Sequence, residues 1–267
     1  MSHIADTYNV WTSMLQFLAT LDPNESVYAG MYMWVQSELF PYGGAGFVVS
    51  RPALQAAVAY YNDHEEKLEK FVDQHFNGDA AIGEVMKGAG ARFFNAWPSM
   101  QADYPGWLTF DVEAAKNWPM VDAIARFWCR PVVTFHHVTP DAVRALWLVE
   151  QEWIKQLSDS SDGFLRHRDV FDMYTFPQMT TIPTLDWDNE SDQEDPETSS
   201  MEECQQKCQE RLICFQYSFE DSSRKCRLRE DPRLGTSKPG VRSGWLIGRI
   251  RGFRADMPVC HDVHWPS

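Results

Sequence analysis

Basic residues are scarce in this chain of 267 residues: 24 Lys and Arg stand against 38 Asp and Glu, and the formal net charge is −14 at pH 7. Proteins bind a phosphate backbone through clustered Lys and Arg, so this balance argues against a nucleic acid as a partner. The chain also lacks any run of about 18 apolar residues and any basic start leading into an apolar segment. Nothing in the sequence therefore predicts a membrane span or a signal peptide.

Cysteine is almost absent from the first 200 residues, where Cys129 stands alone, whereas four cysteines lie between Cys204 and Cys226. Such clustering is typical of disulfide-linked modules made in an oxidising compartment, which predicts a protein of the secretory pathway. Zinc is the competing interpretation. The segment has neither the C-x-x-C pairs of zinc ribbons nor a histidine, so disulfides are favoured.

Composition divides the chain into four parts. Residues 1–180 are apolar and aromatic, 181–200 are acidic, 201–253 are rich in cysteine, and 254–267 form a tail. The stretch from Asp186 to Glu203 holds nine acidic residues and no Lys or Arg, so we expect 181–200 to be a solvated linker. Strands that alternate with helices in the first part predict an α/β architecture.

Hydrophobic periodicity and turn residues predict the elements of the first part. Thr139 is expected to cap a helix that has Pro140 in its first turn. The predicted elements are a helix over residues 10–21, strands over 27–35 and 47–50, a long helix over 52–76, a short helix from about residue 80, and a helix over 140–157.

Three glycines in PYGGAGFVVSRPAL form the first candidate site. Gly43, Gly44 and Gly46 carry no side chain, so the backbone can take positive φ angles and press against a bulky ligand. A tight turn between two strands is the alternative explanation.

Two further segments hold groups that can do chemistry. Asp79 in NGDAAIGEVM stands where a helix N-cap is expected. His136 and His137 in PVVTFHHVTP are placed at the end of a strand, where adjacent side chains point to opposite faces. We therefore expect at most one of the two histidines to face a site.

Taken in order, GGAG, D-x-x-x-G and FHxV resemble glycosyltransferase family 31, which includes Fringe and the core-1 β1,3-galactosyltransferases. The segment ADTYNVWTSMLQFLATLDP extends the resemblance, and LRHRDVF is similar to the fungal branch. The similarity runs from about Ala5 to about residue 178. It implies that residues 1–180 are the C-terminal part of a transferase domain, with a partial glycosyltransferase-A-like mixed sheet and flanking helices.

The resemblance also implies a reaction. Members transfer a sugar with inversion from a UDP-sugar, here galactose or an N-acetylhexosamine, to a hydroxyl of a glycan or glycoprotein in the Golgi lumen. Mn²⁺ holds the diphosphate and a carboxylate removes the acceptor proton. The implied roles are base for Asp79, metal ligands for Asp6 and His136, sugar-pocket lining for Gly43, Gly44 and Gly46, and sugar stacking for Tyr42 and Trp34.

Two departures from the family pattern leave the activity open. Ile4 stands where the family has a first acidic residue, so one metal ligand is missing. Family members also have a nucleotide-binding βαβ region and a membrane anchor upstream, whereas this sequence begins almost at the metal motif. One interpretation is a fragment of an active enzyme. The other is an inactive relative that binds glycans or proteins.

The Cys-rich segment resembles a PAN/Apple module, a small α+β fold. Cys204 and Cys208 lie one helical turn apart on one helix face, and Cys226 falls in a predicted strand. The resemblance implies Cys204–Cys226 and Cys208–Cys214 disulfides, a closing strand at GWLIGRI, and a glycan or protein ligand.

Two cysteines and two histidines lie outside these motifs. We expect Cys129 to pair with Cys260, the alternative being a cysteine upstream of this sequence. His261 and His264 are interpreted as part of a solvent-exposed tail rather than a metal pair.

Overall fold

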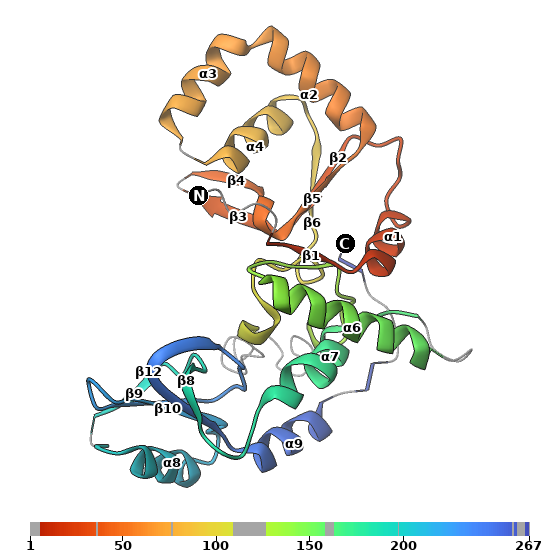
Figure 1. Ribbon diagram of the computed structural model, residues 1–267. Coiled ribbons are helices and arrows are strands. Elements are labelled where there is room, and N and C mark those ends of the chain that lie inside the picture. The colour runs from red at the N-terminus through yellow and green to blue at the C-terminus, as the bar shows by residue number, and fades with distance from the viewer. Residues whose placement is uncertain are drawn as a thin grey trace.

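Figure 1 shows a computed structural model of the chain, which describes residues 6–35, 37–75, 77–108, 127–157, 163–196, 198–257, 259–260 and 265–266. Helices α2 (Arg51–Asp63), α3 (Glu65–Gln74) and α4 (Gly78–Gly88) lie at one end of the molecule. A five-stranded sheet lies at the other end, and α6 (Pro140–Gln156) and α7 (His167–Val170) lie between them.

Strand β2 (Val27–Gly30) is the centre of the first sheet. It pairs antiparallel with β5 (Phe47–Val49) and parallel with β6 (Arg92–Asn95). A parallel pair needs a long crossover, which α2, α3 and α4 supply. This mixed sheet with helices around it agrees with the predicted α/β class.

Two short strand pairs and one helix complete the N-terminal half. Strands β3 (Tyr32–Val35) and β4 (Glu38–Pro41) form a hairpin. Strand β1 (Tyr8–Asn9) pairs antiparallel with β7 (Thr134–Phe135), although more than a hundred residues separate them. Helix α1 spans Trp11–Leu18, inside the predicted range.

Helix α6 begins as the sequence predicts, because Thr139 Oγ1 accepts a hydrogen bond from the Ala142 N–H at 3.3 Å and Pro140 opens the first turn. The prediction of one helix over 52–76 is wrong, since α2 and α3 are separate helices. The break lies at His64, whose backbone leaves the helical region at φ −131°. Its Nδ1 bonds to the Tyr60 carbonyl at 2.9 Å, which the His64 N–H would use in a continuous helix.

The second sheet has the order β8-β12-β10-β11-β9, with every neighbouring pair antiparallel. Helix α8 (Met201–Glu210) is fastened to it by the Cys204–Cys226 disulfide, and the Cys208–Cys214 disulfide closes the loop after the helix. These are the two pairings that the resemblance implied. The strands are β8 (Thr184–Asp188), β9 (Gln193–Asp195), β10 (Gln216–Glu220), β11 (Lys225–Arg229) and β12 (Thr236–Trp245).

The acidic segment 181–200 is not a linker, because it supplies the edge strands β8 and β9 of this sheet. Its carboxylates face cations of later strands and loops. The ion pairs are Asp188–Lys238 at 2.7 Å, Glu194–Lys225 at 2.9 Å, Asp192–Arg229 at 2.7 Å and Asp195–Arg211 at 3.1 Å.

The predicted closing strand at GWLIGRI is only partly correct, since β12 ends at Trp245 and Ile247–Asp256 form helix α9. This helix joins the two parts. Trp245 and Ile250 share one core with Trp128 and Phe171 of the first part. In addition, the Gly106 carbonyl accepts backbone hydrogen bonds from residues 234 and 235, at 2.9 and 3.1 Å.

The chain beyond α9 returns to the first part. Cys260 forms a disulfide with Cys129, and Trp265 packs on Phe17 with ring centroids 5.6 Å apart. Its carbonyl accepts a hydrogen bond from Arg130 Nη1 at 2.8 Å. The predicted Cys129–Cys260 pair is thus confirmed and anchors the tail, while His261 and His264 lie outside the described residues.

Among the residues that the structure describes, no helix combines the length and the apolar character needed to cross a bilayer.

One side chain of α9 holds the loop after α8 in place. The guanidinium of Arg249 donates hydrogen bonds to the carbonyl oxygens of Cys208, Gln209, Arg211 and Cys214, over distances of 2.5 to 3.0 Å. The last turn of a helix leaves carbonyl groups without partners, and here a cation satisfies them.

Replacing Arg249 by Ala should lower the free energy of unfolding by roughly 2 kcal/mol, because charge-assisted hydrogen bonds are lost. Trypsin should also cut faster after Arg211, which urea unfolding and native-state proteolysis on reduced gels would show. Arg251→Ala, an exposed change on the same helix, is the control. Equal behaviour of the two variants would contradict the role of Arg249.

Candidate functional site

The glycine loop predicted as a site forms a turn of 3-10 helix, η1 (Gly43–Ala45), whose backbone is bonded from several sides. The Gly43 N–H donates to Asp79 Oδ2 at 2.8 Å. The carbonyls of residues 44 and 45 accept from Thr7 Oγ1 at 2.8 Å and Thr134 Oγ1 at 2.6 Å. The loop is thereby fixed to the residue before β1, to β7 and to α4 together.

Two positions of this loop require glycine, one because a side chain would have no space and the other because of its backbone angle. A Cβ at Gly44 would stand 2.5 Å from His136 Cε1 and 2.6 Å from the Tyr42 ring. Gly46 has φ of +80°, a conformation that strains other residues. The sequence therefore identified a loop that must approach other groups closely.

Asp79 turns toward this loop. The N-cap of α4 is Asn77, whose side chain accepts from the Asp79 N–H at 2.9 Å, so the alternative that Asp79 is an N-cap is wrong. Asp79 stands in the first turn instead, and its half-buried carboxylate reaches the Gly43 N–H.

Asp6 and His136 meet beside the same loop. Asp6 Oδ1 lies 3.1 Å from His136 Nε2, and the imidazole is almost fully buried. Nδ1 of His136 bonds to the Ala102 carbonyl at 3.2 Å. A carbonyl can only accept, so Nδ1 carries a proton and Nε2 is the ring nitrogen that faces the carboxylate. Two acceptors at this distance repel each other unless a proton or a metal cation lies between them.

His137 also faces Asp6, so the expectation that at most one histidine faces the site is wrong. Its Nδ1 lies 3.7 Å from Asp6 Oδ2, and the two imidazole centroids are 3.9 Å apart. Strand β7 ends at Phe135 and His137 has a left-handed φ of +54°, so the alternation of a strand does not apply.

The donor atoms of Asp6, His136 and His137 all lie within 4.8 Å of one another. Carboxylate oxygen suits Mn²⁺, and imidazole is a common ligand of first-row divalent metals. The hydrogen bond from Nδ1 to a carbonyl is the usual support of a metal-bound histidine. These residues fit a divalent cation such as Mn²⁺.

The phenol group of Tyr42 lies near several carboxylates. Burial raises the pKa of Tyr42, and the charges of Asp79, Asp6 and Asp103 raise that pKa further. Its ring stands edge-on to His136, with centroids 5.5 Å apart. Tyr42 therefore lies between the carboxylate of α4 and the Asp6 cluster. Sequence analysis missed Asp103, which belongs to no motif.

Trp34 is exposed on β3, where it pairs in register with Leu39, and no contact in the described part of the chain joins it to the other predicted residues. Ile4 lies outside the described residues.

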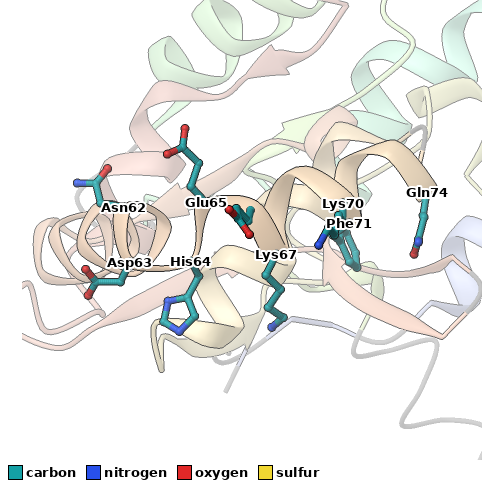
Figure 2. A pocket seen from close by; sticks show the side chains of 9 residues that line it. Asn62, Asp63, His64, Glu65, Lys67, Lys70, Phe71 and Gln74 are labelled. Atoms are coloured by element: carbon teal, nitrogen blue, oxygen red, sulfur yellow. The ribbon is translucent and has the colours of Figure 1, made fainter.

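A separate surface groove lies at the joint of α2 and α3 (Figure 2). His64 and Lys67 line it, together with other exposed polar side chains, and Lys67 pairs with Glu84 at 3.1 Å. None of the predicted site residues lines this groove, so we assign it no role.

His167, in the LRHRDVF segment, packs against Phe135 of β7. Its ring is fully buried, stacks on Phe127 and stands edge-on to Phe135. Nε2 bonds to the Pro98 carbonyl at 2.9 Å. Burial lowers the pKa of His167 to about 4, so the ring is neutral in the folded protein at neutral pH.

Comparison with known proteins identifies one part of the chain. Residues 178–241 match the family model of the PAN domain, which confirms the predicted module. The match begins well before residue 201 and includes β8 and β9, in agreement with their place in the sheet. A search of curated proteins found no match to the chain.

Replacing Gly44 by Ala should lower the free energy of unfolding by about 1 to 3 kcal/mol, because the new methyl group meets two packed rings. Chemical denaturation would measure the change. Gly78→Ala is the matched control, since its Cβ would have open space around it. If Gly44→Ala unfolds at the same urea concentration as the control, the close packing is refuted.

The buried His167 predicts a pH dependence of stability. Its pKa is lower folded than unfolded, so the unfolded chain binds more protons below about pH 6.5, and stability falls as pH decreases toward 4. Between pH 7 and pH 5, titration of this group should lower the free energy of unfolding by about 2 kcal/mol.

His167→Gln should remove that share of the pH dependence, whereas the exposed control His64→Gln should keep it. The two profiles of unfolding free energy against pH are to be compared, because other groups titrate in the same range. Parallel profiles would show that His167 is not buried in neutral form.

Proposed function

We propose that this chain carries the metal-binding and acceptor-activating part of an inverting glycosyltransferase. The reaction moves galactose or an N-acetylhexosamine from a UDP-sugar to a hydroxyl of a glycan or glycoprotein. The observation that supports this proposal most is that Asp79 and the Asp6–His136 pair converge on one glycine loop, Asp79 on Gly43 and His136 on Gly44.

Asp79 is the proposed base. Its Oδ2 is held by the Gly43 N–H, which aims the carboxylate and leaves Oδ1 to accept the proton of the acceptor hydroxyl. The acceptor oxygen then forms a bond to the anomeric carbon of the donor as the bond from that carbon to the UDP oxygen breaks on the opposite face. A single displacement of this kind inverts the anomeric configuration.

Asp6 and His136 would hold the cation. A bound Mn²⁺ supplies positive charge that offsets the charge developing on the UDP diphosphate. The His136 ring is buried, hydrogen-bonded to the Ala102 carbonyl and packed close to Gly44. These contacts hold Nε2 in one orientation. Tyr42 is partly exposed, so its aromatic face could pack on a sugar ring.

The proposed compartment is the lumen of the Golgi. Disulfides persist in oxidising compartments, and all six cysteines are paired in this structure. UDP-sugars and glycoprotein acceptors are the proposed partners, with a further glycan or protein ligand at the PAN domain.

A second candidate function is binding of a glycan or protein without catalysis. Leu212 and Ile213 are 91% and 55% exposed at the loop that Arg249 and the Cys208–Cys214 disulfide hold. Large apolar side chains on a rigid, exposed loop favour a contact surface. Ile4, in place of an acidic residue, also favours a chain that has lost activity.

Asp79→Asn should reduce kcat/KM for sugar transfer by about 100-fold or more, because an amide cannot accept the proton. The assay supplies Mn²⁺, labelled UDP-galactose or UDP-N-acetylhexosamine and a panel of glycan acceptors, and it measures labelled product. The control Asp63→Asn changes an exposed carboxylate at the end of α2 and should keep full activity. Absence of transfer by the unmodified chain, together with binding of the chain to a glycan array, would instead support the second candidate.

A further inference from the structure

We infer that His137 is a third protein ligand of the cation held by Asp6 and His136, and that this centre prefers Co²⁺ or Zn²⁺ to Mg²⁺. The inference rests on the proposed metal site. It assigns a ligand that the sequence motifs did not predict, and it gives the site a metal preference.

The first reason is position. His137 Nδ1 lies 3.7 Å from Asp6 Oδ2, on the other oxygen from the one that faces His136. All three donor atoms fall within 4.8 Å, a spread that small adjustments of side chains can reduce to that of ligands around one ion. The His137 side chain is 45% exposed, so a metal can reach it from solvent.

The second reason is the backbone at His137. Its φ of +54° is uncommon for a residue other than glycine, and it sends the side chain to the same side as His136. Such conformations persist where the surrounding structure enforces them, and they cluster at functional sites. The ring of Trp107, 5.5 Å away between centroids, covers another side of the imidazole.

The third reason is that both sides of the cluster are fixed before any ion binds. The Val138 N–H donates to the Asp6 carbonyl at 2.8 Å, and Tyr8 pairs in register with Phe135. Tyr8 also donates a hydrogen bond from its hydroxyl to buried Glu150 at 2.6 Å. The spacing of the ligands is therefore set by backbone and core, which favours tight binding.

The chemistry of the ligands sets the preference. Two imidazoles and one carboxylate form a set with more nitrogen than Mg²⁺ or Ca²⁺ prefers, whereas Co²⁺ and Zn²⁺ bind imidazole well. Three protein ligands leave coordination positions for water or an oxygen of a substrate.

The test measures binding of Co²⁺ and Mg²⁺ to the full chain by isothermal titration calorimetry, with the visible spectrum of Co²⁺ as a second readout. His137→Asn is the main variant, because Asn tolerates the left-handed backbone but has no imidazole. We expect one Co²⁺ per chain, a loss of affinity of at least 10-fold in this variant, and an altered spectrum. His64→Asn is the control for loss of an exposed imidazole and should bind as the unmodified chain does.

Three other results would each contradict one part of the proposal: the ligand role of His137, the metal preference or the metal site itself. Unchanged Co²⁺ affinity and spectrum in His137→Asn, with binding lost in His136→Asn, would show that His137 is no ligand while the Asp6–His136 site stands. Displacement of Co²⁺ by an equal concentration of Mg²⁺ would refute the metal preference. Absence of bound Co²⁺ in the unmodified chain would refute the metal site itself. Circular dichroism of each variant identifies a folding defect, and His137→Gln then replaces a variant that fails to fold.

Discussion

The buried segment 131–136 is the constraint on which the site depends. Residues 132–135 have no solvent exposure, and their backbone groups bond to partners from distant parts of the chain. The Val133 N–H donates to the Ser99 carbonyl at 2.8 Å, the Val133 carbonyl accepts from Val10 at 2.9 Å, and the Val132 N–H donates to Leu165 at 2.8 Å. An unpaired buried backbone group would be costly, so these bonds fix where the segment ends. Because His136 directly follows Phe135, these bonds also place His136 beside Asp6.

The same constraint connects the candidate site to the PAN domain. Cys129 precedes this segment and is bonded to Cys260, just beyond α9. Trp128 lies in the apolar core that contains Trp245 and Ile250, and Arg254 pairs with Asp172 at 2.5 Å. Because the two parts share a core, the PAN domain is held against the first part rather than carried on a linker. A ligand bound by this domain would therefore be held against the first part at a fixed place, at the end of the molecule opposite to α4 (Figure 1).

Sequence analysis succeeded where local chemistry decides the structure. The cap at Thr139 and the pairing of the clustered cysteines each depend on a few neighbouring residues or on a family pattern. The glycines of residues 43–46 indicated a close approach, but they did not indicate its distant partner, His136. Sequence analysis failed where distant partners decide. Counting acidic residues over 181–200 did not reveal the cations on β11 and β12 that pair with them, and strand alternation could not anticipate the left-handed backbone of His137. The break at His64 has a local cause, a side chain that competes for a helix carbonyl, which periodicity does not detect.

The central claim of this account is that Asp6, His136 and His137 form one preformed cation site beside the Gly43–Gly44 loop. Crystals of the unmodified chain grown with Co²⁺, with diffraction recorded on both sides of the cobalt absorption edge, test it most directly. The account predicts one strong anomalous peak about 2.1 Å from His136 Nε2 and within bonding distance of Asp6 and His137 Nδ1. A peak bound elsewhere, or a fully ordered Asp6–His136 pair joined by a hydrogen bond with no cobalt beside it, would contradict it.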